Sequence, residues 1–224
     1  MDFVEANDDN ATSTNNEISI DELQDTSVDM ISQAQNPNVL LPQYKNAHLD
    51  FVTGIKYLNY KYRMLRRVRG DGNCFYRSCF FGYLEGLLSK YTGDDAKNKE
   101  DAIIEKNRIL KIITESKEEL IQYGYSEIAI ESFYDIVIEV LENLFTTMTH
   151  DELLNSFQAS GLSDYYTWYM RLLTSLSMKK NVDRYLPFID DVDMNSYCLR
   201  SSTTTTTTTN YIIIIIIITI INIH

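Results

Sequence analysis

The 224-residue sequence has too few cysteines and histidines to build a disulfide framework or a metal site. It contains three of each. Cys74, Cys79 and Cys198 lack the paired Cys/His spacing of a zinc site, so we expect no metal and no organic cofactor. Sparse, odd-numbered cysteines and the lack of an apolar N-terminal signal segment favour a reducing compartment. We therefore expect a cytoplasmic protein that is also present in the nucleus.

Positive charge is also scarce. The chain has 20 Lys and Arg residues against 32 Asp and Glu residues, a net charge of −12. Nucleic-acid binders carry a basic footprint, so this balance argues against a nucleic-acid partner. The longest apolar stretch, residues 211–223, is shorter than the roughly 20 residues that a membrane-spanning helix needs. We expect no membrane partner.

A glycine-containing loop leads into an amphipathic helix. Residues 69–77 read Arg-Gly-Asp-Gly-Asn-Cys-Phe-Tyr-Arg. Apolar residues then recur at helical spacing, at Phe80, Phe81, Leu84, Leu87 and Leu88. Cys74 is therefore expected in the first helical turn, where free N–H groups and the helix dipole stabilise a thiolate. The backbone N–H groups of Gly72, Asn73 and Cys74 are candidate donors to an oxyanion. The alternative is a buried structural cysteine after an ordinary glycine turn.

Residues 71–77 resemble the nucleophile loop of the ovarian-tumour (OTU) class of deubiquitinating cysteine peptidases. Residues 35–37 (Gln-Asn-Pro), 151–157 (Asp-Glu-Leu-Leu-Asn-Ser-Phe), 163–165 (Ser-Asp-Tyr) and 169–175 (Tyr-Met-Arg-Leu-Leu-Thr-Ser) resemble the otubain branch of that class, in the same order. The resemblance implies that Cys74 hydrolyses isopeptide bonds of ubiquitin through a thioester. It implies that Asp71 supports the oxyanion loop, although an Asx turn with no part in the chemistry is the simpler alternative. The implied partners are ubiquitin, polyubiquitin and, through the N-terminal arm, a ubiquitin-conjugating enzyme.

The resemblance also implies the fold class. We expect an α+β (α/β-like) chain, the papain-like OTU cysteine peptidase fold, present mainly as its helical half with the late sheet strands missing. Residues 1–32 are expected to form an acidic, largely disordered arm with a short helix. Residues 33–200 form the incomplete peptidase domain, and residues 201–224 form a low-complexity Thr/Ile tail. We interpret that tail as a truncated or misread C-terminus, because back-to-back homopolymers are typical of translated repeat DNA.

Apolar periodicity predicts helices over residues 44–62, 74–90, 103–124, 130–148 and 165–176, with shorter helices over 149–157 and near Asn195. The first helix is expected to be interrupted at Gly54, and Gly161 is expected to end the helix over 149–157. Thr149 and Glu152 predict a capping box. Residues 62–69 are expected to form a short edge strand or extended run. The last long helix is expected to bury Tyr165, Trp168, Tyr169, Leu172 and Leu176.

A cysteine peptidase also needs an imidazole, and the sequence offers no clear one. The resemblance places that histidine on a late strand beside an aromatic residue, a motif that is absent here. His48 precedes the nucleophile, His150 lies in a capping turn that should face solvent, and His224 is the last residue. No catalytic histidine is therefore assigned. Two alternatives stay open: a non-catalytic module that binds ubiquitin or a loaded conjugating enzyme, and the product of a broken gene.

Overall fold

A computed structural model describes residues 29–44, 48–189 and 193–203 of the chain, with side chains through residue 198. The predicted acidic arm as far as residue 28, and the Thr/Ile tail from residue 204, lie outside these ranges. The elements of the described ranges are, in order, η2 (Pro37–Leu40), α1 (Leu49–Lys61), α2 (Cys74–Thr92), α3 (Ala96–Gln122), α4 (Glu127–Asn143), α5 (His150–Gln158), α6 (Ser160–Lys180), α7 (Val182–Tyr185), η3 (Leu186–Phe188) and α8 (Met194–Thr203).

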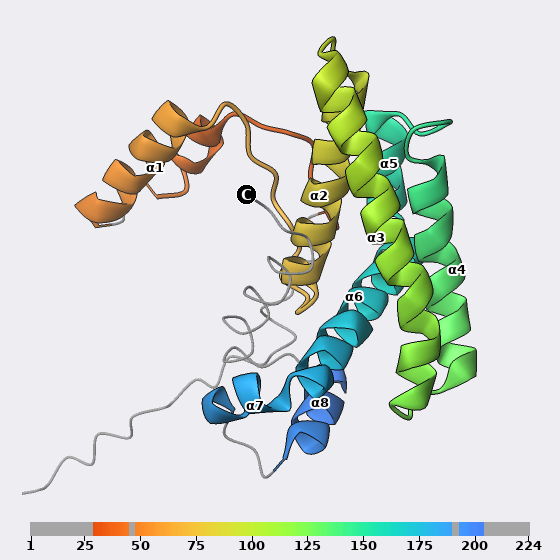
Figure 1. The fold of residues 1–224 in the computed structure, drawn as a ribbon. Coiled ribbons are helices and arrows are strands. Elements are labelled where there is room, and N and C mark those ends of the chain that lie inside the picture. Colours follow the sequence, from red (N-terminus) through yellow and green to blue (C-terminus); the bar gives the residue numbers. More distant parts are fainter. Residues whose placement is uncertain (1–28, 45–47, 190–192, 204–224) are drawn as a thin grey trace, which may run out of the picture.

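Helices α2 to α6 pack into one bundle (Figure 1), in which α3 and α4 lie side by side. One aromatic cluster joins three of these helices: Phe80 of α2, Phe157 of α5 and Tyr166 of α6, with ring centroids 4.6 to 5.9 Å apart. Each of these side chains is at most 3% exposed. Burying rings of this size contributes several kcal/mol, roughly 2–3 for each ring. The cluster therefore fixes α2, which begins at Cys74, against α6.

A buried hydrogen bond attaches α6 to α3. The hydroxyl groups of Ser116 and Tyr169 lie 2.8 Å apart, and the Tyr169 hydroxyl also donates to the Ile113 carbonyl at 3.3 Å. Burial raises the pKa of Tyr169 to about 12. The neutral hydroxyl is thus favoured, and it satisfies polar groups that would otherwise be costly inside the bundle.

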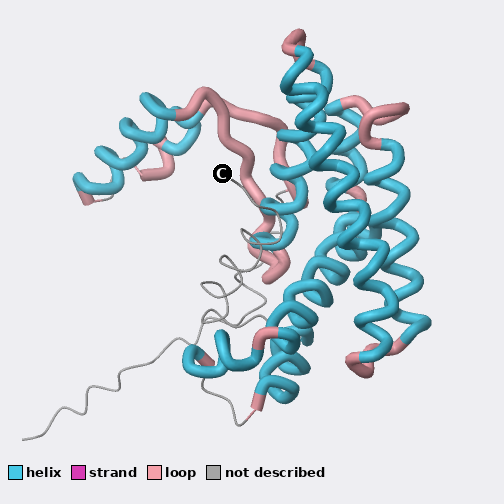
Figure 2. Tube along the Cα trace, viewed as in Figure 1, coloured by secondary structure: helices cyan, strands magenta, loops and turns pink. Residues whose placement is uncertain are grey.

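The expected α+β class is not seen in the described residues, which contain helices and no strand (Figure 2). Residues 62–69 form the extended run, which pairs with residues 30–35 in two isolated antiparallel bridges, Ile31 with Val68 and Gln35 with Leu65. Two short segments with one neighbour each do not make an independently stable sheet, because that takes three or more strands. Only the helical half of the expected fold is therefore confirmed.

Most predicted helices are confirmed, including the short helix near Asn195 and the capping box of Thr149 and Glu152. Two predicted glycine breaks are wrong. Gly54 lies inside α1, which runs on without interruption, because a single glycine costs a helix only about 1 kcal/mol. Gly161 is the second residue of α6. The chain breaks instead at Ala159, whose backbone is extended at φ −67° and ψ 107°.

The predicted buried face of α6 is wrong for Trp168, which is 40% exposed. Tyr165 and Leu172 are half-buried, and Leu172 packs against the core. The buried face instead includes Ser163, Tyr166, Thr167, Tyr169, Met170, Leu173, Thr174 and Leu176. Its threonine hydroxyls donate to carbonyls within the same helix, so these residues are buried without an unpaired polar atom. Apolar periodicity alone missed this face because part of it is polar.

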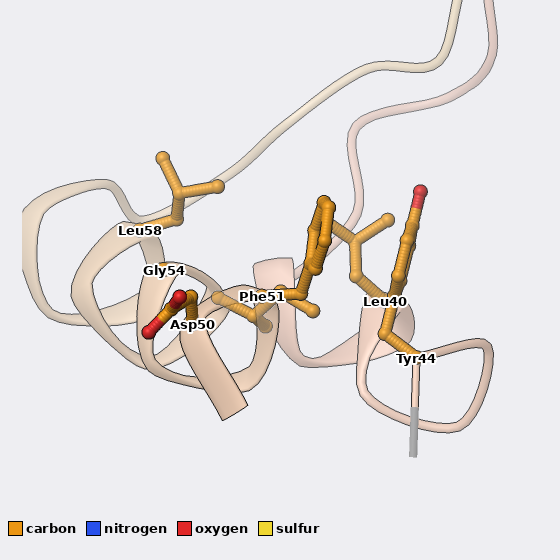
Figure 3. A pocket seen from close by; sticks show the side chains of 7 residues that line it. Leu40, Tyr44, Asp50, Phe51, Gly54 and Leu58 are labelled. Carbon is orange, nitrogen blue, oxygen red and sulfur yellow. The ribbon is translucent and has the colours of Figure 1, made fainter. Parts of the chain in front are cut away.

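Helix α1 and η2 form a small unit that stands away from the bundle in Figure 1. Between them lies a pocket of about 380 Å³. In Figure 3 the rings of Tyr44 and Phe51 face each other across it, with centroids 6.0 Å apart.

Of the helices in the described ranges, none has the length and apolar character needed to cross a membrane.

Candidate active site

Cys74 is the first residue of α2, as predicted, and its thiol is free and half-buried. The residue before it, Asn73, caps the helix with φ −100° and ψ −4° and makes no side-chain capping bond. Gly72 has φ +80°, a left-handed conformation that only glycine adopts cheaply. The tight loop therefore depends on glycine at position 72, and it delivers the thiol to the positive end of the helix dipole.

Asp71 folds the loop back on itself and binds a buried arginine. Its Oδ1 accepts the Asn73 N–H at 2.9 Å, which is the Asx turn predicted as the simpler role. The same oxygen accepts Arg77 Nη1 at 2.9 Å, and Oδ2 lies 2.8 Å from Arg77 Nη2. Charge-assisted pairs of this kind are the strong hydrogen bonds of proteins. Asp71 thus ties the loop to the second turn of α2.

Arg77 also reaches α6. Its side chain is fully buried, and its Nε donates to Ser163 Oγ at 2.7 Å while Nη2 lies 3.3 Å from Asp164 Oδ1. Burial raises the pKa of Asp164; Arg77 opposes this shift and Asp71 adds to it. One buried guanidinium therefore pairs with two carboxylates, and it links the loop before Cys74 to the start of α6.

A second arginine holds the loop from the other side. Arg171 of α6 donates from Nη2 to the Gly72 carbonyl oxygen at 2.8 Å and from Nε to Asn73 Oδ1 at 3.1 Å. Its guanidinium lies over the Tyr76 ring, 4.9 Å from the centroid. The loop before Cys74 is thus held by two arginines, one from α2 and one from α6.

Neither arginine, nor Ser163 or Asp164, was assigned a role from the sequence, although all four lie in the stretches that carry the family resemblance. A signal for Arg77 was present. It falls on the same helical stripe as Phe80, Phe81, Leu84 and Leu88, so it lies on the buried face of α2. A charged residue on an apolar stripe must find buried partners, because an unpaired buried charge is too costly. No comparable signal marks Arg171.

Within the described ranges no imidazole lies beside Cys74. His150 is the exposed first residue of α5, and its Nε2 is 3.1 Å from Ser89 Oγ. Ser89 follows Cys74 by fifteen residues of α2, which is roughly 22 Å along the helix axis. His48 caps α1 in the outlying unit, 3.1 Å from the Asp50 carboxylate. His224 lies outside the described residues. Within the described residues there is also no cluster of three or more side chains that could bind a metal ion.

A groove of about 440 Å³ runs along α2 beside the extended segment at residues 64–68. Ser78 and Gly82 line it, four and eight residues after Cys74. Residues spaced by four share one face of a helix. The groove therefore lies along the second and third turns of α2, shortly after Cys74.

We expect iodoacetamide near neutral pH to alkylate Cys74 well before the other two cysteines. Burial raises the pKa of both Cys79 and Cys198, which lowers their thiolate fraction. Cys74 instead is the first residue of α2, at the positive end of the helix dipole. Peptide mass spectrometry of the folded chain over time measures the three rates, with Cys74→Ser as the control. Equal alkylation rates at all three cysteines would contradict the prediction that Cys74 is the most reactive of them.

Comparison with known proteins agrees with this geometry. The family model described as "Peptidase C65 Otubain" matches residues 23–224. Human "Ubiquitin thioesterase OTUB1" is 33% identical over 161 residues, which cover 72% of this chain and 55% of the relative. In Arabidopsis thaliana, "OVARIAN TUMOR DOMAIN-containing deubiquitinating enzyme 1" is 27% identical over 199 residues, or 86% of this chain and 62% of the relative.

A solved structure shares the fold. It is "a ceOTUB1 ubiquitin aldehyde UBC13~Ub complex", which aligns with a TM-score of 0.76 and 25% identity over 90% of this chain and 77% of that chain. The chain spans little more than half the length of the OTUB1 sequence that it matches, 55%. The family model nevertheless covers nearly all of this chain. The chain therefore belongs to the otubain family of cysteine peptidases, peptidase family C65.

Proposed function

We propose that the chain carries the nucleophile site of a cysteine hydrolase that acts on ubiquitin, a deubiquitinase that cleaves isopeptide bonds of ubiquitin chains or conjugates. Turnover of an isopeptide also needs a proton donor, which the described residues do not bring to Cys74. The observation that carries this proposal is the position of Cys74 at the start of α2, behind a loop held by Arg77 and Arg171. The relatives named ubiquitin thioesterase or deubiquitinating enzyme support the choice of substrate.

In the proposed reaction the Cys74 thiolate attacks the carbonyl carbon at the C-terminus of ubiquitin. The resulting tetrahedral oxyanion collapses to a thioester when the C–N bond breaks and the nitrogen takes up a proton, which must come from a group outside the described residues or from solvent. Water then attacks the thioester, which releases ubiquitin and returns the Cys74 thiol. The Asn73 N–H is already donated to Asp71. Of the three predicted donors, we therefore assign the oxyanion to the N–H groups of Gly72 and Cys74. Asp71 supports the loop that presents them.

The proposed partners are ubiquitin, polyubiquitin and a ubiquitin-conjugating enzyme. This follows from the solved otubain complex, which contains ubiquitin aldehyde and UBC13~Ub. We assign residues 33–200 to the peptidase domain and its helices to the papain-like α+β OTU fold. Residues 30–32 of the predicted arm are buried and belong with this domain, and the paired segments 30–35 and 65–69 lie on its sheet side. The three free cysteines fit the cytoplasm and the nucleus.

Ubiquitin with a C-terminal vinyl sulfone tests the proposal. This electrophile needs a nucleophilic thiol and a ubiquitin site, but no proton donor for a leaving group. We expect one adduct, on Cys74, which is lost in Cys74→Ala and retained in the matched variant Cys79→Ala. Intact mass and peptide mapping measure it. Failure of the native chain to form the adduct, while iodoacetamide still labels Cys74, would reject ubiquitin as the substrate.

A second function, a non-catalytic module that holds ubiquitin or a ubiquitin-loaded conjugating enzyme, is favoured by one observation. His48 and His150, the histidines of the described residues, both lie away from Cys74. Such a module needs no thiol. It would bind ubiquitin with the same affinity in the native chain and in Cys74→Ala, and it would form no vinyl sulfone adduct.

A further inference from the structure

One peptide group of the nucleophile loop is held at both ends. Gly72 contributes its carbonyl oxygen, which accepts Arg171 Nη2 at 2.8 Å. Asn73 contributes its N–H, which is donated to Asp71 Oδ1 at 2.9 Å. In a trans peptide these two groups point in opposite directions. The plane of this peptide is therefore fixed between α6 on one side and the Asx turn on the other.

The loop needs this restraint because of its glycine. Gly72 has φ +80°, and a glycine moves between backbone conformations at little cost. A rotation of the peptide after Gly72 would turn the carbonyl dipole and move the neighbouring N–H groups. A carbonyl oxygen turned toward the reacting carbon would repel a developing oxyanion, whereas fixed N–H groups stabilise it. The conformation of this one peptide thus decides the electrostatics next to Cys74.

Arg171 is itself well placed to hold the peptide. Its guanidinium lies 4.9 Å from the centroid of the Tyr76 ring, and Tyr76 is 4% exposed. Its Nε makes a second bond to the loop, to Asn73 Oδ1 at 3.1 Å. A planar guanidinium that stacks on a ring and donates twice has little freedom left. Arg171 therefore restrains the loop, because it extends from α6 and α6 is itself packed in the core.

We propose that Arg171 is a positioning residue that sets the oxyanion-binding conformation of the Cys74 loop. This inference rests on the proposed acyl-transfer function and adds to it a residue that does not touch the substrate. It acts through the Gly72–Asn73 peptide. It therefore affects reactions of Cys74 that pass through an oxyanion, and leaves simple alkylation of the thiol almost unchanged.

Acyl transfer from a thioester isolates this effect. When Cys74 attacks a thioester, a bond forms between Sγ and the carbonyl carbon. The thiolate then leaves with the electron pair of the broken C–S bond, so no proton donor is required. The probe is a blocked Gly-Gly alkyl thioester, which needs no ubiquitin site. The rate at which the acyl group appears on Cys74 is read by intact mass, and the iodoacetamide rate is measured in parallel.

We expect Arg171→Met to lower the acyl-transfer rate about tenfold or more, since losing one oxyanion donor typically costs about 10²- to 10³-fold. The iodoacetamide rate should change less than about twofold, because this displacement develops no oxyanion on carbon. Arg184→Met is the matched control: Arg184 stacks over Tyr185 of α7, 5.5 Å from the ring centroid, and both rates should stay at the native value. Arg171→Lys, which can replace one of the two hydrogen bonds, should give an intermediate acyl-transfer rate.

Chemical rescue separates positioning from folding. Free guanidinium ion, well below unfolding concentrations, should restore acyl transfer in Arg171→Ala and leave Arg184→Ala unaffected. Equal acyl-transfer rates in the native chain and Arg171→Met, a parallel loss of both reactions, or no rescue by guanidinium would overturn the proposal. The proposed function fails separately: a ubiquitin C-terminal thioester would then acylate the native chain no faster than the Gly-Gly thioester does.

Discussion

Replacing Arg77 with methionine is expected to lower the free energy of unfolding by about 3 kcal/mol. Arg77 is fully buried, and it pairs with both Asp71 and Asp164, whose side chains are 15% and 29% exposed. Breaking a buried ion pair by removing one partner typically costs about 3–5 kcal/mol, because a charge is left without compensation. Because the two carboxylates are partly exposed, we expect a loss of unfolding free energy at the lower end of this range. Urea unfolding followed by circular dichroism measures it.

Lys180→Met provides the matched control, because Lys180 and Glu119 pair at 2.7 Å with side chains that are 44% and 39% exposed. An exposed pair contributes about 0–1 kcal/mol, so this variant should unfold almost like the native chain. Equal losses of unfolding free energy in Arg77→Met and Lys180→Met would contradict the role of Arg77 as the buried partner of Asp71 and Asp164. A loss in Arg77→Met below about 1 kcal/mol would contradict it too.

The loss in Arg77→Met should also depend on pH. The pKa of Asp164 is raised above its ordinary value of 3.8, so the folded state holds this proton more tightly than the unfolded state does. The cost of keeping Asp164 ionised is fully present above the folded pKa and is relieved as the pH falls toward the unfolded pKa. Removing Arg77 takes away a lowering influence on that pKa. The difference between Arg77→Met and the native chain should therefore shrink as the pH is lowered from neutrality toward the ordinary Asp pKa.

Much of the helical fold could be predicted from the sequence. The stripe of Phe80, Leu84 and Leu88 places the buried face of α2, and the capping box at Thr149 places the start of α5. The prediction failed where polar groups decide burial. Ser163 and Thr167 are buried in α6 because their hydroxyls find partners at Arg77 and the Asp164 carbonyl. Hydrophobic periodicity contains no information about such hydrogen-bond partners.

Only those parts of the site that are close together in the sequence could be predicted. Asp71, Gly72 and Cys74 lie within four consecutive residues, so their place in the loop and at the start of α2 follows from the local sequence. The hydrogen bonds of Arg77 to Ser163 and of Arg171 to Gly72 join residues 86 and 99 positions apart. Such contacts depend on how α2 and α6 pack. No local pattern around Arg171 indicates that it reaches the loop.

We expect the 224-residue chain to hydrolyse di-ubiquitin negligibly. An amine leaves a tetrahedral intermediate only after protonation, and the described residues bring no imidazole to Cys74. Loss of one member of a catalytic triad typically costs about 10⁴- to 10⁶-fold in rate. Gel analysis of di-ubiquitin over hours, beside a full-length otubain relative and the Cys74→Ala variant, measures this. Cleavage at the rate of the relative would mean that an acid lies in reach of Cys74, and His150 and His48 would then be replaced in turn.

Single-turnover acylation of Cys74 by two ubiquitin donors tests the central claim most directly. A ubiquitin C-terminal thioester releases a thiolate and needs no acid, whereas di-ubiquitin releases an amine and needs one. If Cys74 and its arginine-held loop form a working nucleophile site without a proton donor, intact mass will show ubiquitin on Cys74 from the thioester and none from di-ubiquitin. No acylation of Cys74 from the ubiquitin thioester would contradict the account.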